Sequence, residues 1–75
     1  MRITLNGDGY TANGPRTIAD LLAHLGIDPR RVAVERNYVI VKRDAYAATE
    51  ITEGDQIEIV NFVGGGSPFG NVEIG

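Results

Sequence analysis

The apolar and polar residues of the N-terminal third follow first the period of a strand and then that of a helix. Residues 2–6 alternate in polarity, as a strand with one buried face does. The dipeptide Asn6-Gly7 comes next, and it is a strong hairpin signal because both residue types tolerate a positive φ. We therefore predict a β-hairpin whose second strand covers residues 10–12.

A single helix is predicted after this hairpin. Apolar residues recur there at helical spacing and form one stripe, which consists of Ile18, Leu21, Leu22 and Leu25. Thr17 is placed to cap the helix, and Gly26 is placed to end it in a left-handed conformation. A helix of about nine residues is marginal on its own, so we expect the stripe to pack on a sheet.

The second half of the chain is predicted to add three strands. Two short ones cover residues 32–36 and 39–41, and a long final one covers residues 56–63. Between them, residues 42–48 are expected to form a loop with one helical turn in which Tyr46 points inward. A hairpin, a helical crossover and a final strand beside the first predict an α+β fold: a mixed sheet of about five strands packed on one main helix. This is the β-grasp arrangement of ubiquitin.

The composition narrows the chemistry that the chain can perform. Its 75 residues make one small domain at most. With no cysteine and one histidine, the chain has no disulfide, no thiol nucleophile and no multi-histidine metal site of its own. No nucleophile–base pair can be assembled, so we expect that the chain is not an enzyme. The net charge of −3 argues against nucleic-acid binding, and no apolar run is long enough to span a membrane. We expect a cytoplasmic monomer that binds no cofactor.

The final strand runs directly into three glycines, Gly64-Gly65-Gly66, which nine residues follow. Such a triplet can be a flexible linker. It can also be an arm without side chains that threads a narrow channel, and four extended steps from Phe62 reach about 13 Å. An arm of this kind would carry a terminal carboxylate into a partner's active site. Attack on ATP would there give an acyl-adenylate, which is an electrophile for a sulfur nucleophile.

The residues that lead into the glycines resemble a known family. The stretch 57–66, Ile-Glu-Ile-Val-Asn-Phe-Val-Gly-Gly-Gly, is similar to the ending of ThiS proteins, the sulfur carriers of thiamin thiazole biosynthesis. Further matching segments lie upstream at residues 5–7, 17–22, 32–37, 39–41, 46 and 53–55. The similarity covers residues 1–66, which we assign to one ubiquitin-like sulfur-carrier domain. Residues 67–75 form a C-terminal extension that we expect to be flexible.

The resemblance implies a role for each glycine and a set of partners. A C-terminal carboxylate on Gly66 would be the adenylate and thiocarboxylate site, with Gly64 and Gly65 as the threading arm. A ThiF-like enzyme that uses ATP would adenylate it, a cysteine desulfurase would supply the sulfur, and a ThiG-like thiazole synthase would use it. The chain would then be a protein co-substrate on which these enzymes act.

The extension departs from the family, whose carriers end at the glycines. In this sequence Gly66 has an amide where the chemistry needs a carboxylate, so we expect the extended chain to be inactive until it is processed. Proteolytic removal, a fusion to a downstream domain and a cloning remnant are three open explanations. The alternation of residues 71–74 is typical of a short strand, which favours natural sequence over a tag.

The face of the final strand opposite to Ile57 and Ile59 is a candidate docking surface. Val60 and Phe62 share that face and would form an apolar patch for the adenylating enzyme, while Glu58 would steer a basic partner. Ordinary packing against a loop or the extension is the other interpretation of the patch.

Other titratable residues are interpreted as structural, and two other functions stay open. His24 is read as a surface residue near the end of the helix, and Glu53 and Asp55 as turn residues. A MoaD-type carrier for molybdopterin synthesis is one alternative, although those proteins usually reach the glycines through a proline-containing segment. The other is a non-catalytic β-grasp binding module whose glycines are only a linker.

Overall fold

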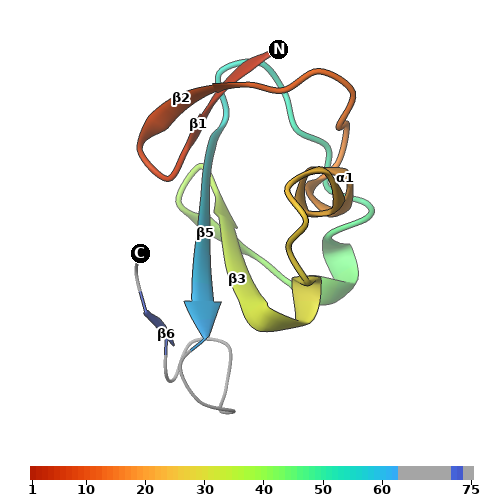
Figure 1. Ribbon diagram of the computed structural model, residues 1–75, viewed down its shortest axis with the longest axis vertical. Helices are drawn as coiled ribbons and strands as arrows, with labels where there is room; N and C mark the ends of the chain where they lie inside the picture. The colour runs from red at the N-terminus through yellow and green to blue at the C-terminus, as the bar shows by residue number, and fades with distance from the viewer. Residues whose placement is uncertain (63–71, 74–75) are drawn as a thin grey trace.

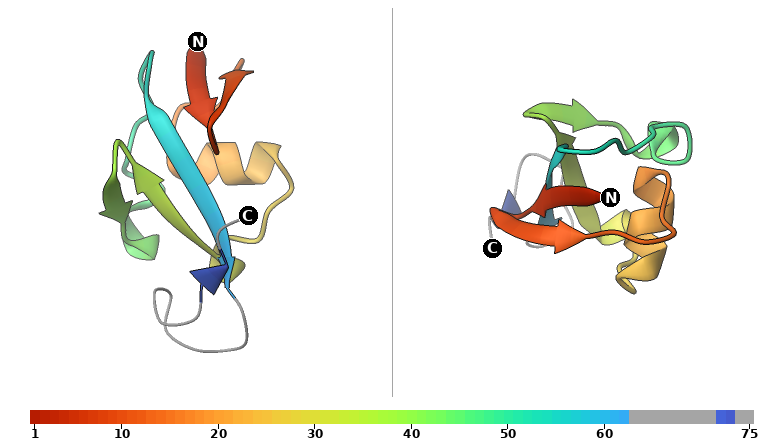
Figure 2. Two further views of the ribbon diagram at one scale, coloured as in Figure 1. Left: turned by 90° about the vertical axis from the view of Figure 1, so that its left-hand side faces the viewer. Right: turned by 90° about the horizontal axis from the view of Figure 1, so that it is seen from above.

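The computed structural model describes residues 1–62 and 72–73. Its strands are β1 (Arg2–Leu5), β2 (Asp8–Thr11), β3 (Val32–Arg36), β4 (Val39–Val41), β5 (Gln56–Phe62) and β6 (Val72–Glu73), and its one helix within these residues is α1 (Ile18–His24). The strands form one mixed sheet in the order β2-β1-β5-β3-β4, and β6 pairs with β5 beside that path. The helix crosses one face of the sheet (Figures 1 and 2). The α+β fold predicted from the sequence, with one helix on a mixed sheet, is confirmed.

The N-terminal hairpin forms where the sequence predicts it. Strands β1 and β2 are antiparallel, with Leu5 opposite Asp8. Asn6 has a φ of 49° and Gly7 a φ of 86°, which are the left-handed conformations that a two-residue hairpin turn requires. On its other side, β1 runs parallel to β5, with Thr4 opposite Gln56. The hairpin therefore places the first strand beside the last.

The helix is held at both ends by the predicted residues. At the start, the backbone N–H of Asp20 donates to Thr17 Oγ1 at 3.1 Å, and the N–H of Thr17 donates back to Asp20 Oδ2 at 3.2 Å. This reciprocal pair is a capping box, and its hydrogen bonds to backbone N–H groups lower the pKa of Asp20. At the other end, Gly26 turns the chain with a φ of 71°. The helix spans seven residues, two fewer than expected.

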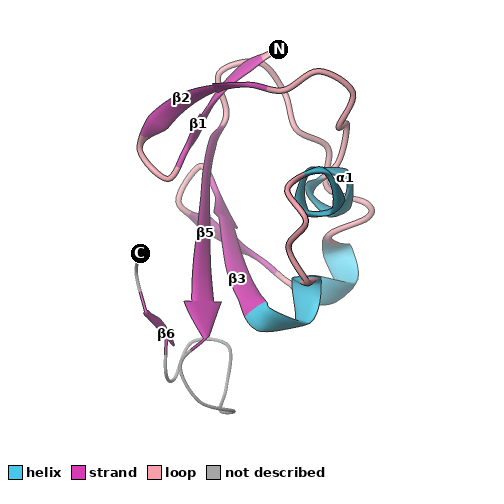
Figure 3. Ribbon diagram, in the orientation of Figure 1, coloured by secondary structure: helices cyan, strands magenta, loops and turns pink. Residues whose placement is uncertain are grey.

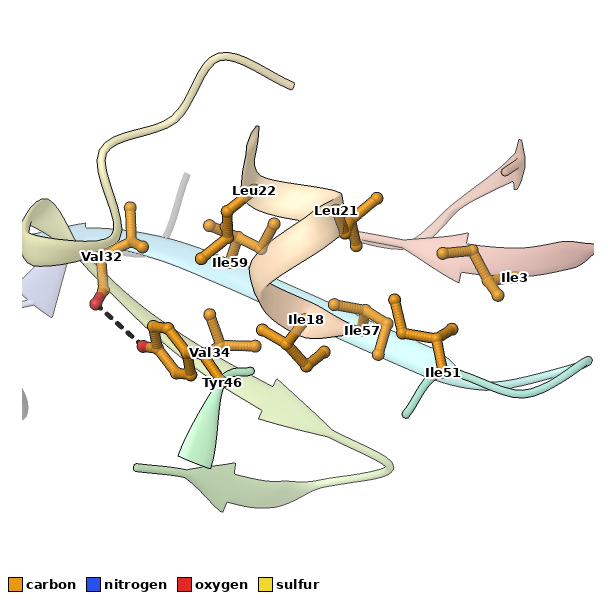
Figure 4. Packing of buried hydrophobic residues seen from close by; sticks show 10 residues of the cluster. All are labelled: Ile3, Ile18, Leu21, Leu22, Val32, Val34, Tyr46, Ile51, Ile57 and Ile59. Atoms are coloured by element: carbon orange, nitrogen blue, oxygen red, sulfur yellow. Dashed lines mark hydrogen bonds between the residues drawn. The ribbon is translucent and has the colours of Figure 1, made fainter. Parts of the chain in front are cut away.

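The core lies between the helix and the sheet (Figure 4). It is formed by ten buried residues, which are Ile3, Ile18, Leu21, Leu22, Val32, Val34, Tyr46, Ile51, Ile57 and Ile59. The helix residues face the isoleucines of β5, as the predicted stripe requires. Tyr46 is 4% exposed, which confirms its inward position, and its hydroxyl donates to the carbonyl oxygen of Val32 at 3.3 Å. Burial raises the pKa of Tyr46.

Short irregular segments connect the later elements. Two 3₁₀ turns, η1 (Pro29–Arg31) and η2 (Arg43–Ala45), precede β3 and follow β4 (Figure 3). The second is the helical turn expected in the loop, whereas the first was not predicted. Asp28 caps the start of η1, because its side chain accepts a hydrogen bond from the backbone N–H of Arg30 at 2.9 Å. Among the described residues, no helix has the length and apolar character needed to cross a membrane.

Candidate docking surface and C-terminal arm

Strand β5 leads directly to the predicted arm. It pairs antiparallel with β3, with Val34 opposite Ile59. Ile57 and Ile59 are 1% and 8% exposed and face the helix, so the predicted alternation holds without a bulge along the strand. The last described residue before the glycines is Phe62. The packing of these two isoleucines therefore fixes which face of β5 points to the helix.

The opposite face of the sheet, which we call the outer face, carries the three residues proposed for docking. Glu58, Val60 and Phe62 are all half-buried there, and Ala33 lies opposite Val60 on β3. Ala33 is 3% exposed, so its surroundings cover the sheet closely at this point. The patch of Val60 and Phe62 is thus partly covered and partly accessible. Its role in docking stays a prediction.

A carboxylate pair on the outer face was not foreseen. The register of the strands places Glu35 directly opposite Glu58, and both are half-buried. Like charges in directly opposed positions of neighbouring strands are unfavourable. The steering role expected for Glu58 stays a prediction. Register is a long-range property, and the sequence alone carried no signal for it.

Asp55 is the centre of a buried polar network and more than a turn residue. It is 5% exposed, and Arg36 Nε donates to its Oδ2 at 2.7 Å. The backbone N–H of Thr52 donates to the same oxygen at 2.8 Å, and Asn37 Nδ2 donates to Oδ1 at 3.0 Å. Burial alone would raise the pKa of Asp55, but these hydrogen bonds outweigh it and lower the pKa to about 2. Both oxygens are occupied, and Asp55 lies just before the start of β5, so its role is structural.

Glu53, the other acidic residue of this turn, also serves the fold. Its carboxylate accepts the backbone N–H of Arg2 at 3.1 Å. Between the two acids, Gly54 has a φ of 83°, as its position in the turn predicts. His24 is exposed in the last turn of the helix, which confirms its surface position. Among residues 1–62 and 72–73, no cluster of histidine and carboxylate side chains could hold a metal ion.

The glycines themselves lie outside the described residues. Gly64, Gly65 and Gly66 are therefore assigned by the sequence alone, as is the boundary between the carrier domain and the extension. Within the extension, the short strand expected at residues 71–74 is present as β6. The flexibility expected of residues 67–75 stays a prediction.

A second apolar surface lies at the far edge of the sheet from β1. Tyr38, Val39 and Ile40 are 72%, 67% and 49% exposed, beginning in the turn between β3 and β4. Tyr38 has a φ of 68°, a conformation that is strained for an aromatic residue, and its hydroxyl donates to Gln56 Oε1. This surface was not predicted as a site, and β3 separates its strand, β4, from β5.

Comparison with known proteins identifies the family. The model of the ThiS family matches residues 3–66. The chain belongs to the ThiS family. It is 48% identical over 50 residues to "Sulfur carrier protein ThiS" of Bacillus subtilis, a match that covers 67% of this chain and 76% of that protein. A crystal structure of the thiamine biosynthesis protein ThiS from Geobacter metallireducens superimposes with a TM-score of 0.77 at 35% identity, covering 88% of this chain and all of that one.

One similar ThiS-family sequence is part of a much longer protein. A "Thiazole synthase" of Paramagnetospirillum magneticum is 45% identical over 67 residues, which are 89% of this chain. The chain spans only 21% of the length of that relative. The match to the ThiS family and the similarity to the ThiS crystal structure confirm the family membership and the β-grasp fold that were expected from the sequence.

Proposed function

We propose that this chain is a sulfur carrier for thiamin thiazole biosynthesis and that the carboxyl group of Gly66 carries the sulfur. The observation that supports this most directly is the ThiS family match, which ends at residue 66, the last glycine of the arm. The relative from Bacillus subtilis, named a sulfur carrier protein, supports the same activity. Strand β5 ends at Phe62, and one residue, Val63, separates it from the glycines in the sequence.

Activation begins with a free carboxylate at Gly66. In the extended chain, residues 1–75, this group is an amide, so hydrolysis of the bond between Gly66 and Ser67 must come first. A carboxylate oxygen then attacks the α-phosphorus of ATP, a P–O bond forms and pyrophosphate leaves. The adenylating partner, a ThiF-like enzyme, binds the ATP, so the carrier itself needs no cofactor. The product is an acyl-adenylate with AMP as its leaving group.

Sulfur then replaces AMP. Attack by hydrosulfide at the acyl carbon forms a C–S bond and breaks the C–O bond, and AMP departs with the electron pair. Loss of a proton leaves the thiocarboxylate. If a cysteine desulfurase offers the sulfur as a persulfide, an acyl disulfide forms first, and a thiol reductant releases the thiocarboxylate from it. Each step occurs in a partner's active site, which makes the carrier a co-substrate and not an enzyme.

The acceptor of the sulfur is proposed to be a ThiG-like thiazole synthase. The supporting observation is that a relative named thiazole synthase contains a stretch similar to nearly all of this chain. One polypeptide named thiazole synthase thus includes a segment similar to this ThiS-family chain.

The outer face is proposed to dock the adenylating enzyme. Val60 and Phe62 offer an apolar contact immediately before the arm, and Glu58 with Glu35 offers paired negative charge. We expect the complementary surface to present an arginine or lysine beside apolar side chains. Docking at this surface would hold the body outside the active site while Gly64 and Gly65 thread into it.

The test compares three forms of the chain with a ThiF-like enzyme, ATP and sulfide. A chain ending at Gly66 is expected to be adenylated and converted to the thiocarboxylate. The extended chain is expected to stay unmodified, and so is a folded control chain that ends at Gly64. Equal adenylation of the Gly66-ended and extended chains would overturn the processing requirement. If the chain ending at Gly64 were converted equally well, the assignment of the sulfur site to Gly66 would be wrong. If none of the three forms were adenylated, the carrier function would be wrong and the binding module would be favoured.

A further inference from the structure

The main-chain groups of β5 point alternately to its two neighbours. On the side of β1, the N–H of Thr4 donates to the carbonyl of Asp55 at 2.9 Å, and the N–H of Asn6 donates to that of Ile57 at 2.9 Å. Alternation continues along a strand, so the main-chain groups of residues 59 and 61 point to the same side. Strand β1 ends at Leu5 and does not reach them.

The side chain of Asn6 takes the place of a strand at the next position. The N–H of Ile59 donates to Asn6 Oδ1 at 2.7 Å, and Asn6 Nδ2 donates to the carbonyl of Ile59 at 3.1 Å. One carboxamide thus satisfies both main-chain groups of Ile59, as a paired strand would do. The edge of β5 is closed as far as residue 59.

Past Asn6 the edge pairs with a separate strand. Strand β6 lies antiparallel to the end of β5, with Glu73 opposite Asn61 and Val72 opposite Phe62 (Figure 1). It lies on the side of β5 away from β3, because Val32 of β3 pairs with Asn61 from the other side. The last two residues of β5, Asn61 and Phe62, therefore have an edge that accepts an added strand.

We propose that this edge of Asn61 and Phe62, the Asn61 edge, is a strand-addition site for the enzyme that receives the arm. An extended segment of that enzyme pairs with it antiparallel through main-chain hydrogen bonds, and β6 holds the same place in the extended chain. The segment has an apolar residue in register with Phe62 and a polar one in register with Asn61, as β6 has. This proposal rests on the proposed function, since it concerns the partner of the same arm.

Strand addition would serve the arm in two ways. Edge strands pair readily with extended segments, and main-chain pairing gives affinity without demanding a particular sequence. A strand fixed beside Phe62 would also keep the following residues extended and aimed in one direction, which a glycine segment does not do by itself. The extended chain would be blocked in two ways, through its amide at Gly66 and through β6 at the Asn61 edge.

A matched pair of variants tests the site in the chain ending at Gly66. Asn61→Pro removes the N–H of residue 61, and proline is tolerated where a strand's N–H faces an open edge. Asn61→Ala keeps the N–H and removes only an exposed side chain. We expect the Kd for a ThiF-like enzyme with ATP to rise about tenfold for Asn61→Pro and to change less than about twofold for Asn61→Ala. Equal affinities of two folded variants would overturn the proposal.

Amide hydrogen exchange gives a second readout that needs no variant. The amide of Asn61 is expected to be protected in the extended chain, to exchange at least about tenfold faster in the Gly66-ended chain, and to be protected again in the enzyme complex. The amide of Ile59, held by Asn6, is the internal control and should be protected in all three. An Asn61 amide that exchanges in the complex as fast as in the free Gly66-ended chain contradicts the proposal, even if Asn61→Pro does not fold.

The two measurements separate this inference from the proposed function. If the Gly66-ended chain is adenylated but Asn61→Pro binds as Asn61→Ala does, only strand addition is wrong. If the Gly66-ended chain neither binds the enzyme nor becomes adenylated, both proposals fail.

Discussion

Arg36 Nε lies 2.7 Å from Asp55 Oδ2 and ties the end of β3 to the turn that leads into β5. Asp55 is buried, and the turn residues Thr52 and Asn37 complete its hydrogen bonds. This contact sets the residue at which β5 starts. Strand β5 begins at the next residue, Gln56, and runs to Phe62, so the ion pair lies at the start of the strand that leads toward the glycines.

The lowered pKa of Asp55 predicts acid sensitivity. A carboxyl whose pKa falls from 3.8 to about 2 on folding contributes about 2 kcal/mol to the free energy of unfolding. The contribution is fully present above the unfolded-state pKa of about 4 and is lost as pH falls through about 2. Urea unfolding between pH 7 and pH 2 measures it. In Asp55→Asn, the free energy of unfolding should lack this loss at low pH. An equal decrease of the free energy of unfolding with falling pH in both proteins would contradict the role assigned to Asp55.

Removal of the Asn6 side chain is expected to destabilise the fold. Asn6→Gly keeps the positive φ of the turn but leaves the N–H and carbonyl of Ile59 without their partner. A loss of about 1–3 kcal/mol in the free energy of unfolding follows from two lost hydrogen bonds. Asn13→Gly, in an exposed loop position, is the matched control and should change stability by less than about 0.5 kcal/mol. Similar losses for both would argue against the edge-closing role of Asn6.

The capping box makes a separate prediction at the helix. Thr17→Ala removes the hydroxyl that accepts the N–H of Asp20 and should cost about 1 kcal/mol of stability. Thr17→Ser keeps the hydroxyl and should stay near the original stability. Thermal unfolding followed by circular dichroism distinguishes the two variants. Equal melting temperatures for alanine and serine would show that the cap does not matter.

Alanine substitutions at Phe62 and at Ile40 distinguish a docking role from the general effect of removing an apolar surface side chain. Both belong to the sheet, but Phe62 adjoins the arm whereas Ile40 is 49% exposed on the edge strand β4. In the chain ending at Gly66, Phe62→Ala should lower kcat/KM for adenylation about tenfold, and Ile40→Ala should change it less than about twofold. A melting curve for each variant confirms that the fold is retained. If Phe62→Ala is as active as Ile40→Ala, the patch packs locally and docks nothing.

Much of the fold could be predicted because its signals are local. The turn at Asn6-Gly7, the leucine stripe and the alternation of Ile57 and Ile59 each depend on residues close in sequence. The contacts that could not be predicted join distant parts of the chain. Asn6 meets Ile59 across 53 positions, and the cross-strand position of Glu35 against Glu58 depends on register. The fold topology decides which residues a polar side chain meets. The sequence around Asp55 indicated only a turn, and its burial beside Arg36 could not be predicted from it.

For the site, the sequence was more informative than the geometry. The glycine arm and the match to the ThiS family both come from residue identities. In the structure, Phe62 is the last described residue before the glycines. What the structure adds lies on β5 and its neighbouring strands: a half-buried apolar patch, a carboxylate pair and a strand edge that β6 occupies. Each of these surfaces depends on which strands are neighbours in the sheet, and a local sequence pattern does not predict that.

The intact mass of the carrier from its native cell tests the central claim most directly. Our account predicts a polypeptide chain in which Gly66 is the C-terminal residue, with a fraction whose mass corresponds to replacement of one carboxyl oxygen by sulfur. Thiazole formation in a cell where every molecule keeps Gly66 in an amide bond to Ser67 would contradict it.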